Sequence, residues 1–255
     1  MAISPDQSRI AMGEAGQCSL WDAQGRRLVA SLDHRGARVH AVVFSADGRW
    51  LATGDSEGRV RIWDAQTGSI VRDMLGAGPV LSLAFWPDGA RLVAGDIQGR
   101  VLEYRLESGE FVELDFGAAE RRGRAISSLA VSSDGSRLAI ASLARGADSG
   151  FGEASRVRVW DLRTKELIWL PRIDGLVFVL AFSDDGKRLA IAGHDMGFVR
   201  VANITGLPSF TGRPQPLDLA SDDFMINALD FSPDGSQLLT GGKQMQLWDL
   251  EPAWK

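Results

Sequence analysis

The sequence predicts an all-β chain, a β-propeller of four-stranded antiparallel blades, and three observations support this fold class. The first is a motif, an apolar residue followed by a polar turn containing Asp, which occurs six times, at Ile3, Phe44, Phe85, Val131, Phe182 and Phe231. The second is their spacing, 41, 41, 46, 51 and 49 residues, near the period of about 40 to 45 residues that four-stranded blades give. The third is the alternation of apolar and polar residues within each copy, which is typical of strands. Six visible units predict a six-bladed ring or part of a seven-bladed ring.

The first two strands of a unit are expected on either side of an Asp-Gly hairpin. A continuous apolar run, such as residues 39–44, suits a strand that is buried on both faces. Asp-Gly supplies the turn, because Gly accepts positive φ and Asp bonds its own backbone. The second strand follows, as at residues 50–55. Its small Ala, Thr and Gly residues suit a place where neighbouring sheets approach closely.

The third and fourth strands of a unit differ in polarity. Residues 59–64, RVRIWD, alternate Val and Ile with Arg, the period of two that a strand requires. Residues 69–74 are more polar and are expected at the outer edge, where charge blocks unwanted pairing.

The FSPDG, LATG and IWD elements resemble the tryptophan-aspartate (WD40) repeat family of β-propellers, as a bacterial-type array, over nearly all of the chain. The resemblance implies packing roles for four Trp-Asp pairs: Trp21, Asp22, Trp63, Asp64, Trp160, Asp161, Trp248 and Asp249. Two copies depart from the pattern, with Tyr104-Arg105 and Ala202-Asn203 in place of Trp-Asp.

Many members of this family brace a repeat with a hydrogen-bonded set of His, Ser or Thr, Asp and Trp. Here Thr53 and Trp63 match two of the positions, but Glu57 stands where the Asp belongs. His34 lies one residue out of the usual spacing. The resemblance therefore does not allow this hydrogen-bonded set to be assigned to this chain. In the third unit Trp86 replaces the Ser of the turn, either as an exposed contact or as a partly buried side chain.

The chain is expected to form one propeller domain over residues 1–255. Its units are expected at residues 1–33, 34–76, 77–117, 118–172, 173–220 and 221–255. The first strand of the first unit and the fourth strand of the last unit are incomplete. We therefore expect the chain to be a piece of a longer protein.

Net charge, cysteine content and hydropathy limit the possible partners and location of the protein. With 33 acidic and 28 basic residues the net charge is -5, which argues against a nucleic acid or an acidic membrane as partner. Cys18 has no second cysteine to pair with, and its strand-three position predicts a buried structural thiol. The N-terminus has no signal pattern, and the apolar run Leu176–Phe182 is too short to span a bilayer. A soluble, cytoplasmic protein is expected.

The irregular loops predict a partner-binding site in the fourth unit. The interval from the motif residue to the Trp position is 29 residues in this unit and 17 to 20 in the others. The insertion lies roughly at residues 142–155, and a second long loop, residues 117–124, leads into the unit. In a propeller both loops emerge on the same face, the top. The expected site consists of Arg121, Arg122, Arg124, Arg145, Phe151 and Arg156.

Arginines beside an aromatic ring suit an acidic peptide or phosphate, because guanidinium pairs bidentately with carboxylate and stacks on rings. A third long segment, residues 204–215, is assigned to the turn between strands three and four of the fifth unit, so that residues 216–220 form strand four.

The sequence shows no convincing catalytic pattern. Residues 54–58 match the string G-x-S-x-G but lie in a hairpin, whereas that motif needs a strand-to-helix turn and a His partner. His34, His40 and His194 lack metal-ligand spacing. No enzyme activity, metal or cofactor is expected. The expected function is a non-catalytic interaction scaffold that binds a protein or peptide on its top face. The alternatives are a sensor or regulatory module of a multidomain signalling protein, and a propeller-based hydrolase.

Overall fold

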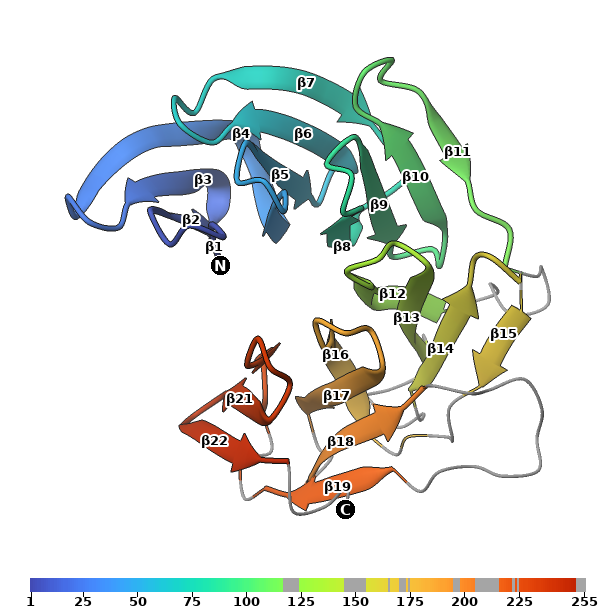
Figure 1. Ribbon diagram of the computed structural model, residues 1–255. Helices are drawn as coiled ribbons and strands as arrows, with labels where there is room; N and C mark the ends of the chain where they lie inside the picture. The colour runs from blue at the N-terminus through green and yellow to red at the C-terminus, as the bar shows by residue number, and fades with distance from the viewer. Residues whose placement is uncertain are drawn as a thin grey trace. The chain divides into compact units, whose positions relative to one another are not determined.

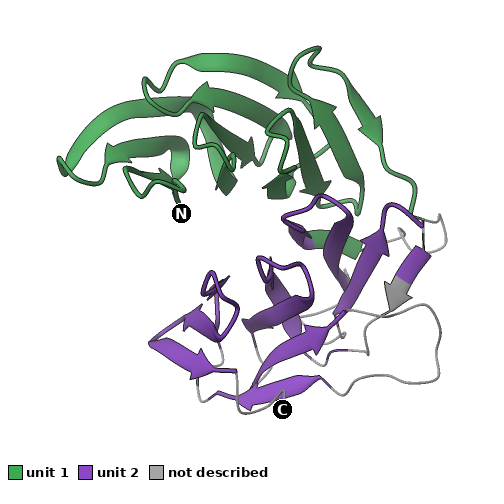
Figure 2. Cartoon of the chain, viewed as in Figure 1, with its two compact units in different colours: residues 1–126 green, residues 127–255 purple. Residues whose placement is uncertain are grey.

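The computed structural model describes residues 1–116, 124–144, 155–164, 166–169, 173, 175–194, 198–204, 216–221, 223 and 225–250. In these ranges all regular structure is β-strand. The chain divides into two compact units, residues 1–126 and 127–255, which are described separately (Figures 1 and 2). None of the described segments forms a helix with the length and apolar character needed to cross a bilayer.

Unit 1 begins with a seven-stranded antiparallel sheet in simple sequential order. Its strands are β1 (Ala2–Ile3), β2 (Arg9–Gly13), β3 (Ala15–Asp22), β4 (Arg27–Phe44), β5 (Trp50–Asp55), β6 (Arg59–Asp64) and β7 (Ile70–Leu75). The sheet holds the first two repeat units, which share the 18-residue strand β4. The first half of β4 pairs with β3 and the second half with β5. Where the halves meet, Arg35 and Gly36 have positive φ angles of 53° and 88°.

The second sheet of unit 1 is the third repeat unit. Its strands are β8 (Val80–Phe85), β9 (Arg91–Asp96), β10 (Val101–Arg105) and β11 (Phe111–Glu113), in the order β11-β10-β9-β8. The fourth strands, β7 and β11, are largely exposed, which agrees with their expected outer position.

The three remaining repeats form one sheet each, and these sheets lie in unit 2 apart from the start of β12. The first has β12 (Arg124–Val131), β13 (Arg137–Ala144), β14 (Arg156–Asp161) and β15 (Glu166–Trp169). The second has β16 (Leu176–Phe182), β17 (Arg188–His194), β18 (Phe198–Asn203) and β19 (Leu217–Ala220). The third has β20 (Ala228–Phe231), β21 (Gln237–Gly241) and β22 (Met245–Asp249). The pairing of β19 with β18 confirms that strand four of the fifth unit follows the long segment.

The strand boundaries follow the local pattern closely. The predicted strands at residues 50–55 and 59–64 coincide with β5 and β6, and residues 39–44 form the end of β4. The small residues of the second strands do lie at close approaches. A Cβ placed on Gly54 would be 2.5 Å from Cγ1 of Val80 in the neighbouring sheet. Glycine is therefore required there for packing between adjacent sheets.

The core of each unit lies between its adjacent sheets. In unit 1 one cluster joins β2 and β3 to β4, β5 and β6 and includes Cys18, Leu20 and Trp63. In unit 2 the corresponding clusters join β13 and β14 to β16 and β17, and β17 and β18 to β20 and β21. Cys18 is fully buried, as predicted, and burial raises the pKa of its thiol to about 12. The thiol therefore remains protonated and acts as a small packing group.

Candidate functional site

Most of the predicted arginine site lies outside the described residues. Arg121, Arg122, Arg145 and Phe151 belong to this part of the chain. Arg124 is the first residue of β12 and is only 9% exposed.

Arg156 is the first residue of β14, and its side chain is exposed. Because Ser142 of β13 pairs with Arg156, the long insertion leaves the sheet between these two strands, as predicted. The structure thus gives two of the six predicted residues different environments, one buried and one exposed.

A hydrogen-bonded serine closes the hairpin between the first two strands in five of the six repeats. Its hydroxyl donates to an Asp two residues later and accepts the backbone N–H five residues later. These serines are Ser4, Ser45, Ser132, Ser183 and Ser232. The pKa of Asp6, Asp134 and Asp234 is lowered to about 2, mainly by the hydrogen bond from the serine hydroxyl. These carboxylates are therefore ionised at neutral pH.

The third repeat replaces this serine with Trp86, which is only 2% exposed. The guanidinium of Arg91 lies 4.6 Å from the centroid of the Trp86 ring, a cation–π contact. Asp88 accepts the backbone N–H groups of Ala90 and Arg91 and so closes the turn without the hydroxyl. Of the two interpretations of Trp86, an exposed contact is therefore wrong, and its burial exceeds the partial burial considered.

The Trp-Asp pairs have distinct contacts. Trp63 is 5% exposed and donates its indole N–H to Thr53 Oγ1 at 2.8 Å. Trp248 makes the equivalent bond to Thr240 at 3.2 Å, while Trp21 and Trp160 are partly buried. The aspartates Asp22, Asp64 and Asp161 accept backbone N–H groups in the turn that follows strand three. Asp249, at the end of β22, is exposed.

A buried ionic cluster lies behind Trp63 in the second repeat. Asp55 Oδ2 is 3.0 Å from His34 Nδ1 and 2.7 Å from Arg61 Nη1, and all three side chains are buried. His34 Nε2 has no partner among the described residues. Arg61 Nη1 also lies 2.7 Å from His34 Nδ1, so the imidazole, the guanidinium and the carboxylate are all in mutual contact.

Burial acts to raise the pKa of the Asp55 carboxyl. Hydrogen bonds from His34 and from the backbone N–H groups of Arg59 and Glu57, together with the charge of Arg61, outweigh burial and hold this pKa below its ordinary value. The cluster consequently contains an ionised carboxylate paired with a guanidinium. Since its members are shielded from solvent, the cluster does not reach a substrate.

The sequence did not identify Asp55 as the partner of His34. By alignment Glu57 stands at the family's Asp position, yet the carboxylate that contacts His34 is two residues earlier. The left-handed residues Arg35 and Gly36 absorb the altered spacing after His34. The imidazole thereby reaches the end of β5.

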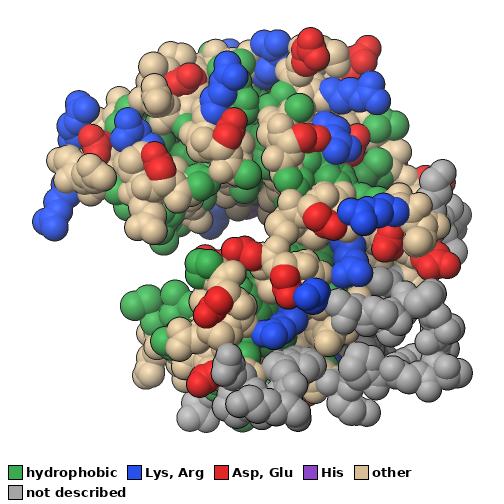
Figure 3. All heavy atoms as spheres, in the orientation of Figure 1, with side chains coloured by type: hydrophobic (Ala, Val, Ile, Leu, Met, Phe, Trp, Pro, Cys, Tyr) green, Lys and Arg blue, Asp and Glu red, His purple; other side chains and the backbone are tan. Residues whose placement is uncertain are grey.

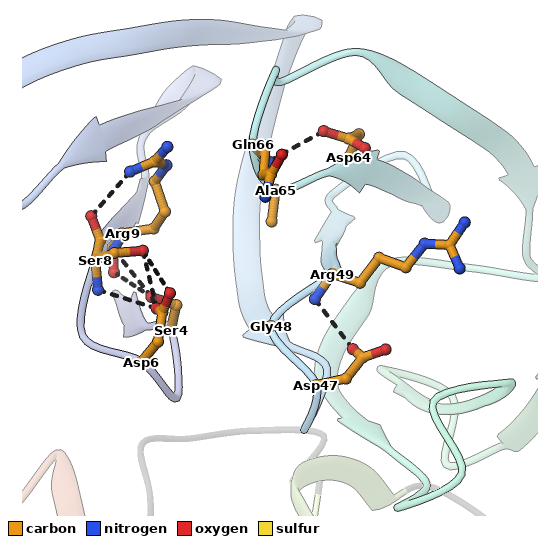
Figure 4. Close-up of a pocket in the computed structure, with 10 residues that line it drawn as sticks. All are labelled: Ser4, Asp6, Ser8, Arg9, Asp47, Gly48, Arg49, Asp64, Ala65 and Gln66. Atoms are coloured by element: carbon orange, nitrogen blue, oxygen red, sulfur yellow. Dashed lines mark hydrogen bonds between the residues drawn. The ribbon is translucent and has the colours of Figure 1, made fainter.

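A surface cavity of about 360 Å³ lies between the first and second hairpins of unit 1 (Figure 4). It is lined by Ser4, Asp6, Ser8, Arg9, Asp47, Gly48, Arg49, Asp64, Ala65 and Gln66. The first four residues come from one hairpin and the next three from the other, while the last three form the turn after β6. The lining is therefore mainly polar. Elsewhere on the visible face of unit 1, acidic and basic side chains are interspersed (Figure 3).

The successive antiparallel sheets, three of them with four strands, together with the repeated hairpin, are those of the β-propeller class. The family model described as WD domain, G-beta repeat, matches residues 26–64 and 217–249 of the chain.

Curated relatives match shorter stretches. The chain is 43% identical over 76 residues to small ribosomal subunit protein RACK1 of Medicago sativa, which covers 29% of this chain and 22% of that protein. It is 31% identical over 85 residues to target of rapamycin complex subunit wat1 of Schizosaccharomyces pombe, covering 32% and 27%. These matches span less than a third of the length of either relative.

Solved structures match nearly the whole chain. Kuenenia stuttgartiensis hydrazine synthase gives a TM-score of 0.79 at 15% identity, covering 98% of this chain and 76% of that one. The β-propeller domain of Myceliophteria thermophila Cps50 (Swd1) gives 0.72 at 16% identity, covering 97% and 81%. At these identities the likeness concerns the fold alone, and it confirms the predicted fold class.

Proposed function

We propose that this protein is a non-catalytic interaction scaffold that binds a protein or peptide through its loops. The observation that carries the proposal is the recurring antiparallel sheet, whose first hairpin is closed by the same hydrogen bonds in five repeats. The sequence attaches loops of unequal length to these sheets. Binding residues are commonly found on loops that a rigid scaffold positions. The relatives add support, since their names describe subunits of larger assemblies, a ribosomal subunit and a target of rapamycin complex.

The proposed contact surface is the arginine site of the fourth repeat. Arg156 contributes an exposed guanidinium at the start of β14. Arg121, Arg122, Arg145 and Phe151 complete the surface on the two long loops. Arg124 is assigned a supporting role because its side chain is buried. An acidic peptide or a phosphorylated segment has the chemistry that such a surface would recognise.

The test compares proteins captured from a lysate by the wild type and by a triple variant, Arg121→Ala, Arg122→Ala and Arg156→Ala. A matched control removes the same charge from exposed arginines of unit 1: Arg38→Ala, Arg72→Ala and Arg105→Ala. We expect the first variant to lose its partners and the control to keep them. Unchanged capture by the first variant would remove the proposed surface.

We also propose that the protein acts in the cytoplasm without a nucleic-acid partner. The net charge of -5 opposes binding to a polyanion, and the lone cysteine needs no oxidising compartment. The rivals are a sensor module of a signalling protein and a hydrolase. Turnover in a hydrolase screen, abolished by changes to residues of this chain, would favour the second rival.

A further inference from the structure

The last sheet ends in a third strand whose outer edge is open. In the first five repeats a fourth strand pairs with the third, and these fourth strands are the first half of β4, β7, β11, β15 and β19. In the sixth repeat the described strands run in the order β20-β21-β22, and none of them pairs with the second edge of β22. The N–H and C=O groups along such an edge are a template for another strand.

Alternate residues of β22 direct their backbone groups to this open edge. Leu250 donates its backbone N–H to the backbone oxygen of Ser236, the residue before β21. Even-numbered residues therefore face β21, because successive residues of an antiparallel strand alternate in direction. The residues whose backbone groups point to the open edge are Met245, Leu247 and Asp249.

The edge formed by β22 lacks the charges that commonly protect an edge strand. Residues 245–248 are uncharged, whereas β7, β11, β15 and β19 each contain at least one charged residue. Met245 and Leu247 are 81% and 62% exposed, while the equivalent residues of β6, Val60 and Ile62, are fully buried. The open edge is therefore apolar and suited to strand addition.

The sequence of β22 is complementary to itself in an antiparallel register. With Leu247 opposite Leu247 of a second copy, Met245 lies opposite Asp249 and Gln246 opposite Trp248. The three residues that point to the open edge then all form hydrogen-bonded pairs, and no like charges are opposed. A two-fold axis relates the two strands, as in an isologous dimer.

We propose that two copies of this chain associate through β22, which pairs antiparallel with β22 of the second copy about Leu247. The two three-stranded sheets then form one continuous sheet. The interface is small, so the dimer is weak, with a Kd on the order of 100 μM. The site is distinct from the arginine loops of the fourth repeat, and the inference does not depend on the proposed function.

The test is sedimentation equilibrium of the purified protein over a concentration series centred on about 100 μM. We expect a monomer–dimer equilibrium. Met245→Asp places a carboxylate opposite Asp249 of the second copy, twice in the interface, and should raise the Kd about tenfold. Met245→Lys places an ammonium there instead and should give a Kd no higher than that of the wild type.

These two variants also separate strand pairing from stacking of the apolar faces, because either charge at residue 245 would weaken stacking. Leu247→Pro removes an N–H that points to the open edge and keeps the pairing with β21, so it should abolish the dimer. The controls Gln66→Asp and Gln66→Lys make the same changes of net charge at an exposed residue of unit 1 and should leave the Kd unchanged.

The proposal is overturned if the wild type remains monomeric at concentrations about tenfold above the expected Kd, which would leave the edge to a strand of another protein. It is also overturned if Met245→Asp and Met245→Lys have the same Kd. Should Leu247→Pro fail to fold, the two charged variants still decide. Because the arginine loops are unchanged in all variants, failure here leaves the capture experiment of the fourth repeat unaffected.

Discussion

Trp63 combines packing and hydrogen bonding in one side chain. It is nearly fully buried between the first and second repeats, and its indole N–H bonds the hydroxyl of Thr53. Removing the ring would leave a cavity and an unpaired buried hydroxyl. Both effects lower the free energy of unfolding.

We expect Trp63→Ala to lower the free energy of unfolding by about 3 to 5 kcal/mol, measured by chemical denaturation. Trp248→Ala is the matched control. Trp248 also bonds a threonine, but it is less buried and its bond is longer, 3.2 Å, so the loss should be smaller. A loss below about 1 kcal/mol for Trp63→Ala would contradict this account.

The environments of some single side chains could be predicted from the sequence, and those of others could not. The burial of Cys18 was predictable, because an alternating strand pattern assigns it to the inner face. The pairing of His34 with Asp55 was not, because it depends on the two left-handed residues that follow His34. The burial of Trp86 was not predictable either, because the repeat pattern has a serine at this position and gives no environment for a larger ring.

The hairpins make stability dependent on pH. In Asp6, Asp134 and Asp234 the folded-state pKa is about 2, below the ordinary value of 3.8. The unfolded chain therefore binds protons first as the pH falls. The stabilisation is complete above the ordinary pKa and is lost as the pH approaches about 2.

We expect the free energy of unfolding to fall between pH 4 and about pH 2, as measured by urea denaturation across this range. Asp134→Asn removes one titrating group and keeps an acceptor for the Ser132 hydroxyl, so its curve should be flatter. The matched control is Asp33→Asn, which changes an exposed carboxylate outside the hairpins. An unchanged slope for Asp134→Asn would show that the hairpin carboxylate does not contribute.

The positions of the strands were the part of this structure that the sequence predicted best. The strands could be located because apolar runs, period-two alternation and Asp-Gly turns are local properties of the chain. The cavity of unit 1 could not be located, because its lining comes from three turns that are separated in the sequence.

At the scale of the whole molecule, the last sheet has an exposed apolar face. Leu239 pairs with Leu247 and Gly241 with Met245, so these residues share one face of β21 and β22. Leu239, Met245 and Leu247 are 43%, 81% and 62% exposed. The opposite face of this sheet packs against β17 and β18. Hydrophobic side chains are visible at this end of unit 2 (Figure 3).

We expect this face to promote self-association, since exposed apolar sheets are prone to pair. Leu247→Lys should lower the weight-average mass in concentrated solution, measured by light scattering, with little change in stability. The control Gln244→Lys adds the same charge in the turn before β22, away from the apolar face. Equal masses for the wild type and Leu247→Lys would show that the face does not drive association.

Strand β4 runs through the first two repeats, with left-handed residues at Arg35 and Gly36 where its halves meet. The first two repeats thus belong to one hydrogen-bonded sheet. A mechanical load on the first repeat would pass directly into the strand that pairs within the second. These two repeats should therefore rupture together under tension.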